Sequence, residues 1–99
     1  MRLTPHQRSI IKSLVIQYFG VSSTVYLFGS RVDDHQKGGD IDLLIQTQQN
    51  IQELVHSEMY FRSALNNQIG EQKVDILTYN PSAKSSKIIE IALKTAVPL

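Results

Sequence analysis

Two short runs decide the fold: Leu27-Phe28-Gly29-Ser30-Arg31, and Gly39-Asp40-Ile41-Asp42-Leu43-Leu44-Ile45. The first run ends a β-rich apolar stretch, residues 24–28, with an abrupt Gly-Ser pair. The second run opens another apolar stretch with two carboxylates. Between the runs, residues 31–39 are polar and end in two glycines, which is typical of a loop. The pattern predicts two strands joined by a polar loop, with acids where the second strand begins.

Helix signals precede these strands. Thr4 can cap a helix in which Pro5 takes the first position and Gln7 completes the spacing of a capping box. Apolar residues then recur at helical spacing as far as Gly20, which suits the end of a helix. The sequence therefore predicts one helix before the first strand.

Further elements follow the second strand. The sequence predicts a helix from Asn50 to Ile69, a strand from Lys73 to Tyr79 and a helix from Ser82 to about Thr95. The buried stripe expected on the first of these helices is Leu54, Phe61, Leu65 and Ile69. The expected fold is α/β (α+β): a small mixed sheet with helices packed on it, in the order α-β-β-α-β-α. Residues 1–99 are expected to form a single domain.

Composition excludes several classes of function. There is no cysteine, so the chain has no disulfide framework, thiolate metal site or cysteine nucleophile. No apolar run approaches the roughly 20 residues that span a bilayer, and no signal peptide is expected. A net charge of +1 does not favour nucleic acid as a partner. The three histidines do not have the spacing of metal ligands. The phosphate-binding motif Gly-x-x-x-x-Gly-Lys-Ser/Thr is absent. A cytoplasmic location is expected.

The carboxylates Asp40, Asp42 and Asp75 sit on or beside predicted strands. Alternate residues of a strand point to one face about 6.5–7 Å apart, so Asp40 and Asp42 project together while Ile41 points to the core. A divalent cation resolves the repulsion between them, and Mg²⁺ prefers oxygen ligands. Asp75 lies in an otherwise apolar strand, where a carboxylate needs a metal, a cation or solvent.

Gly29 and Ser30 follow the first predicted strand. Glycine lets backbone N–H groups approach a phosphate closely, and the serine hydroxyl adds a donor. Arg31 is placed to pair with a phosphate or with a neighbouring aspartate. These residues predict a phosphate site beside the acids.

The runs at residues 27–31 and 39–45 resemble the DNA polymerase β-like nucleotidyltransferase superfamily. More narrowly, the chain is similar to the minimal nucleotidyltransferases that act as antitoxins beside toxins of the HEPN family. The length, the order of elements and Asp75 extend the resemblance over most of the chain. One departure is Gly39, where relatives often carry a serine before the first aspartate; the change leaves the expected metal ligands in place and alters the loop.

The resemblance implies a mechanism. Asp40 and Asp42 would hold Mg²⁺, Asp75 would complete the metal site and act as the candidate base, and Gly29 and Ser30 would bind the β- and γ-phosphates of ATP. The implied reaction is transfer of AMP, with loss of pyrophosphate, to a protein hydroxyl: a tyrosine of a HEPN-type toxin that this chain silences. A hetero-oligomer with that toxin is expected.

Two other functions stay open. The chain could instead be a binding module that neutralises its partner through the apolar faces of the last helix, with no catalysis. Transfer to a small molecule or to an RNA end is a third reading, which the near-neutral charge does not favour. Lys73 is placed equally for an ion pair with Asp75 or for contact with substrate, and Tyr26 and Phe28 are expected to be core residues.

Overall fold

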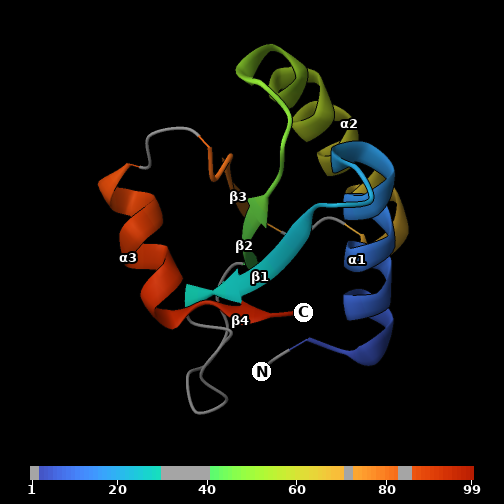
Figure 1. Cartoon of the computed structure of the whole chain (residues 1–99). Coiled ribbons are helices and arrows are strands. Elements are labelled where there is room, and N and C mark those ends of the chain that lie inside the picture. Colours follow the sequence, from blue (N-terminus) through green and yellow to red (C-terminus); the bar gives the residue numbers. More distant parts are fainter. Residues whose placement is uncertain (1–2, 30–40, 71–72, 83–85) are drawn as a thin grey trace.

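A computed structural model describes residues 3–29, 41–70, 73–82 and 86–99. It contains a four-stranded sheet in the order β3-β2-β1-β4 with helices on both faces (Figure 1). The elements, in chain order, are α1 (Pro5–Phe19), β1 (Thr24–Phe28), β2 (Ile41–Gln46), α2 (Ile51–Ile69), β3 (Val74–Tyr79), α3 (Lys87–Thr95) and β4 (Val97–Pro98). β2 runs parallel to β3, and the other pairs are antiparallel, so the sheet is mixed as the sequence predicts.

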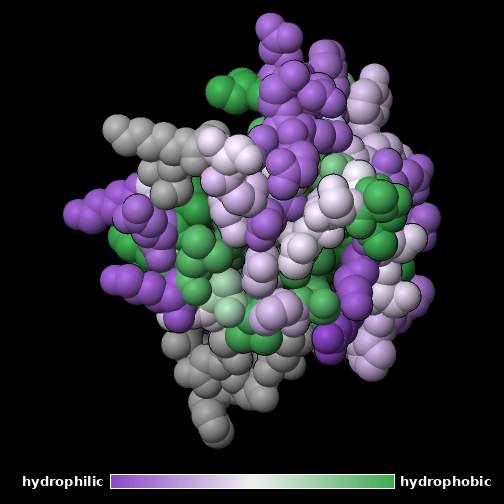
Figure 2. Space-filling model, in the orientation of Figure 1, coloured by the Kyte–Doolittle hydropathy of each residue, from purple (hydrophilic) through white to green (hydrophobic). Residues whose placement is uncertain are grey.

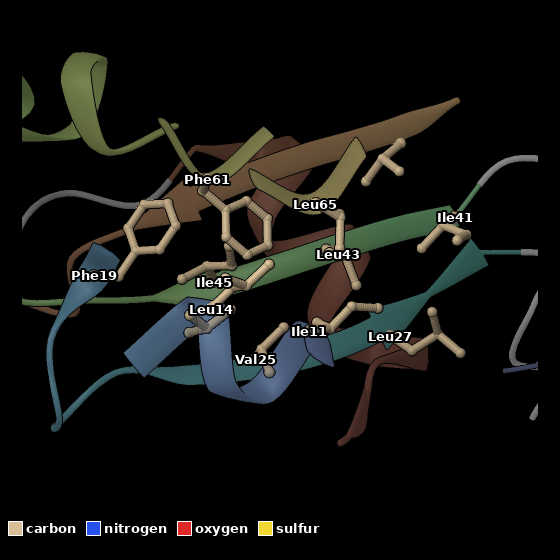
Figure 3. Close-up of a cluster of buried hydrophobic side chains, with 12 residues drawn as sticks. Ile11, Leu14, Phe19, Val25, Leu27, Ile41, Leu43, Ile45, Phe61 and Leu65 are labelled. Carbon is tan, nitrogen blue, oxygen red and sulfur yellow. The ribbon is translucent and has the colours of Figure 1, made fainter. Parts of the chain in front are cut away.

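The main core lies between the sheet and the layer formed by α1 and α2 (Figure 3). Alternate residues of the strands point into it, among them Val25, Leu27 and Ile41, because side chains in a strand alternate between faces. Phe61 of α2 meets Phe19 edge to face, with ring centroids 5.5 Å apart. Of the stripe predicted for α2, Phe61 and Leu65 are buried and the other two residues are partly buried.

Among the described residues, α3 covers the opposite face of the sheet (Figure 1). Leu44 of β2 is buried here against Ile89 and Ala92. Tyr26 and Phe28 are partly buried and pack against this cluster, so the prediction that they are core residues is confirmed. The stretch 24–28 is therefore covered on both faces, which explains its apolar sequence.

The predicted capping boxes form. The Thr4 hydroxyl accepts a hydrogen bond from the backbone of Gln7 at 3.0 Å, and the Gln7 side chain accepts one from the backbone of Thr4. Asn50 and Glu53 make the same reciprocal pair at the start of α2. Two helices thus begin where local hydrogen bonding satisfies donors that the helix itself leaves free.

The predicted start of the last helix is wrong. α3 begins at Lys87, not at Ser82, because the Ser86 side chain caps it while Ser82 belongs to a turn. In that turn the Asn80 side chain accepts a hydrogen bond from the Ser82 backbone at 2.8 Å. The sequence-based prediction also missed β4, a two-residue strand that pairs with β1.

Hydrogen bonds connect the segment that follows β2 to the end of α1. The buried Thr47 hydroxyl donates to the Phe19 carbonyl at 3.1 Å and accepts from the Gln49 backbone at 3.2 Å. The Gln49 side chain donates to Tyr18 and accepts from Ser57 of α2. These bonds fix α1 and α2 relative to the sheet.

No helix within the described ranges is both long and apolar enough to cross a bilayer.

Candidate functional site

Three strands bring polar and small residues together at one end of the sheet. Phe28 of β1 is the register partner of Asp42 in β2, and Asp42 is in turn the partner of Asp75 in β3. Neighbouring strands lie about 4.7–4.9 Å apart, so the two aspartates start from adjacent points on the sheet. The parallel pairing of β2 with β3 therefore joins acids that lie far apart in the sequence.

Asp42 and Asp75 point to the same face of the sheet, opposite to the buried side chain of Ile41. This is the face that α3 covers further along the strands. Asp42 is partly buried, whereas Asp75 is exposed. A carboxylate in an apolar strand needs a metal ion, a cation or solvent. Because Asp75 is exposed, solvent meets this need.

Gly29 directly adjoins Asp42. The backbone of Gly29 has φ +77°, a conformation that other residues rarely adopt. A Cβ built there would overlap Oδ2 of Asp42 and lie 3.1 Å from its Cγ. Glycine is therefore required at this position for two reasons, the positive φ and the contact with Asp42. The Asp42 carboxylate occupies the space that a side chain on residue 29 would need.

Helix α2 holds the strand that carries Asp75. The Arg62 guanidinium donates to the carbonyl of Val74, and the Thr78 hydroxyl donates to Glu58 at 3.0 Å. On the other side of β3, the Ile41 backbone donates to the carbonyl of Lys73 at 3.1 Å. Sequence reasoning missed Arg62 and Glu58; their spacing of one helical turn on the flank of α2 was the available signal.

The predicted site residues divide into two groups. Gly29, Asp42 and Asp75 are brought together by the structure. Ser30, Arg31 and Asp40 lie outside the described residues. Lys73 immediately precedes β3 at the same end of the sheet, and it has an interaction of its own.

The chemistry of this donor set fits a small hard cation. Asp42 and Asp75 offer carboxylate oxygens on adjacent strands of one face, and two like charges so placed repel each other. Mg²⁺ uses one or two carboxylates and keeps open positions for water and phosphate. Within the described ranges there is no group of three possible ligands, and the remaining predicted ligand, Asp40, lies outside those ranges.

Comparison with known families agrees with this geometry. The family model described as "Polymerase beta, Nucleotidyltransferase" matches residues 10–98. The chain belongs to this family. Polymerase beta nucleotidyltransferases generally use a nucleoside triphosphate and a divalent metal ion. A comparison with curated proteins gave no match.

The nucleotidyltransferase fold also separates the acids from a hollow in the surface. That hollow, of about 660 Å³, is lined by residues that follow β2, by the last residues of β3 and by residues at the starts of α2 and α3, including Asn50, Tyr79 and Ser86. The acids stand where β2 and β3 begin. The two features therefore lie at opposite ends of the same strands.

Proposed function

We propose that this chain is a Mg²⁺-dependent nucleotidyltransferase that transfers AMP from ATP to a hydroxyl of a partner protein. The proposed acceptor is a tyrosine of a HEPN-type toxin, which makes this chain the antitoxin of the pair. The proposal includes a cytoplasmic location, where ATP and Mg²⁺ are both supplied.

One observation carries the catalytic part of this proposal. Asp42 and Asp75 are register partners on one face of the sheet, and the missing side chain of Gly29 makes room for the Asp42 carboxylate. A pair of carboxylates next to a side-chain-free backbone suits a metal-bound triphosphate. Membership of the nucleotidyltransferase family supports the same chemistry.

Each residue has a role in the proposed reaction. Asp42 and Asp75, with Asp40, would hold the metal ion, which when bound offsets charge on the attacking and leaving oxygens. Gly29 and Ser30 would bind the β- and γ-phosphates through backbone N–H groups and a hydroxyl. Asp75 is exposed, so it can reach an acceptor hydroxyl and take its proton while pyrophosphate leaves.

A protein acceptor is part of this proposal. The described residues form one small sheet with helices on both faces, and a partner protein would add its own surface to the site. The net charge of +1 gives no electrostatic advantage for an RNA acceptor.

The test is a labelling reaction. Purified wild-type protein and the Asp42→Asn variant are incubated with Mg²⁺, ATP labelled on the α-phosphate, and lysate of the native host or the product of the adjacent gene. We expect one partner band to gain label with the wild type only, and mapping then identifies the modified residue. Equal labelling by the Asp42→Asn variant contradicts the catalytic assignment.

A second candidate is a non-catalytic binding module. It is favoured by three exposed apolar residues of α3: Ile88, Ile91 and Leu93 are 58%, 55% and 40% exposed. Figure 2 shows hydrophobic and hydrophilic side chains side by side over α3. A complex that inhibits the toxin equally well with Asp42 and Asp75 both replaced by asparagine would favour this second function.

A further inference from the structure

β3 is an edge strand, and its backbone groups divide between its two sides. The carbonyls of Lys73 and Tyr79 accept hydrogen bonds from β2 and the residue that follows it, so the odd-numbered residues of β3 face β2. By alternation, the N–H and C=O groups of Val74, Ile76 and Thr78 point outward. An outward row of this kind is a template for another strand.

Only part of this outer edge is used within the described ranges. The carbonyl of Val74 accepts a hydrogen bond from Arg62. In that part of the chain no strand pairs with the outer side of β3, and none of its groups forms a hydrogen bond with the outward backbone of Ile76 or Thr78. The edge therefore offers donors and acceptors in the middle of the strand.

The flank of α2 forms an apolar border beside this edge. Val55 and Met59 are 64% and 56% exposed. Together with Glu58 and Arg62, which bond to β3, they line a groove of about 520 Å³ along the helix. Apolar side chains next to an open strand edge suit an extended peptide whose alternate residues are apolar.

The register of Asp75 links this edge to the proposed chemistry. A strand added antiparallel to β3 would make its hydrogen-bonded pair opposite Ile76 and a non-hydrogen-bonded pair opposite Asp75. In such a pair the Cα atoms are only about 4.5 Å apart and both side chains point to the same face. A residue opposite Asp75 would thus lie beside the acids.

We propose that the acceptor binds as an added antiparallel strand on the outer edge of β3. Its hydroxyl-bearing residue lies opposite Asp75, and the apolar residues before and after it point to the other face of the sheet, where the flank of α2 carries Met59. This assignment rests on the proposed nucleotidyl transfer. The acceptor oxygen forms a bond to the α-phosphorus, the bond from that phosphorus to the bridging oxygen breaks, the proton passes to Asp75, and pyrophosphate leaves.

A pair of variants isolates the edge. Ile76→Pro removes the outward N–H and leaves every hydrogen bond between β2 and β3 intact, a position at which proline is tolerated in sheets. Ile76→Ala is the matched control, because it also gives up the packing of Ile76 against the core but keeps the N–H. Circular dichroism and thermal denaturation check that both variants fold.

The probes are seven-residue peptides, blocked at both ends, with Tyr, Ser or Thr at the centre and Val on either side. Binding to the full chain is measured by fluorescence anisotropy with Mg²⁺ and a non-transferable ATP analogue, and labelling is measured with ATP. We expect Ile76→Pro to bind about tenfold more weakly than Ile76→Ala, because one backbone hydrogen bond is lost. Labelling should fall in parallel, while binding of the analogue stays unchanged.

Three results overturn the proposal: equal binding and labelling by the two Ile76 variants, no binding of any peptide to the wild type, or a wild-type dimer that Ile76→Pro converts to a monomer. The last result assigns the edge to a second copy of the chain. If peptides bind with the expected dependence on Ile76 but nothing is labelled, the edge assignment stands and the proposed transfer fails. If labelling is efficient and independent of Ile76, the transfer stands and the edge assignment fails.

Discussion

The carboxylate of Asp42 occupies the space in which a side chain on Gly29 would begin. β1 and β2 pair antiparallel, with Phe28 opposite Asp42, so the residue after Phe28 meets the acid directly. A backbone without a side chain next to a carboxylate can accept a phosphate and its counter-ion together. The contact explains why a glycine directly follows β1.

Replacing Gly29 with alanine should destabilise the fold more than the same change at Gly70. Both glycines have positive φ, +77° and +85°, so both variants bear backbone strain of about 1–3 kcal/mol. A Cβ at Gly70 meets nothing within 4 Å, whereas one at Gly29 overlaps Asp42. Urea denaturation should show the difference, and only Gly29→Ala should lose binding of Mg²⁺ and nucleotide. Equal losses of stability, with binding retained in both variants, would contradict the contact.

Stabilisation by Mg²⁺ and a non-hydrolysable ATP analogue should depend on Asp75. Removing one carboxylate of the pair relieves repulsion without ligand and removes a ligand to the ion. At a hundredfold excess over Kd, binding adds about 2.7 kcal/mol to the free energy of unfolding, which Asp75→Asn should lose. Glu53→Gln is the control, since glutamine keeps the capping box of α2 while removing one negative charge. The measurement is Tm with and without both ligands, and a full shift in Asp75→Asn argues against metal binding here.

Stability should fall at high pH in a way that depends on Tyr79. Burial, and then the charge of Tyr26, raise the pKa of Tyr79 above its ordinary value of 10.0. Its hydroxyl donates to the Gln46 side chain at 3.0 Å, which also favours the neutral form. The contribution of neutral Tyr79 to the free energy of unfolding is complete below pH 10.0, and it is lost as the pH rises through the raised pKa of the folded state. Denaturant titrations from pH 8 to 11 should show a smaller decline for Tyr79→Phe than for the wild type, whereas Tyr60→Phe, altered at an exposed residue, should behave as wild type.

The Thr47 hydroxyl should matter more than its methyl group. Thr47→Val keeps the shape but leaves the Phe19 carbonyl and the Gln49 N–H without their partner, which costs about 1–3 kcal/mol. Thr47→Ser keeps both hydrogen bonds and loses one buried methyl, at about 0.8 kcal/mol. Denaturation should therefore give a lower free energy of unfolding for Thr47→Val than for Thr47→Ser. Mg²⁺ binding should be unchanged in both, because Thr47 follows β2 at the end far from Asp42; the reverse ranking would show that packing dominates here.

Local signals predicted the elements well where one short stretch contains the whole cause. Thr4 with Gln7 and Asn50 with Glu53 are capping pairs that need only their own helix, and both form. The predicted start of α3 was wrong because Ser82 and Ser86 are equally good helix caps in the sequence. The hydrogen bond from the Ser82 backbone to the Asn80 side chain places Ser82 in a turn, and Ser86 caps the helix. β4 was missed because a two-residue strand has no periodicity and forms only where β1 offers an edge.

The sequence by itself determined the family, the order of the six main elements and the acids worth testing, because the spacing of Gly29, Asp42 and their flanking apolar runs is local. Only the tertiary structure decided that β3 lies parallel beside β2, with Asp75 as the partner of Asp42. It also decided that, in the part of the chain that the structure describes, no strand pairs with the outer edge of β3 beside the exposed Val55 and Met59. The physical reason is that strand order and register follow from how helices cover a sheet, and those contacts join residues that no local pattern connects.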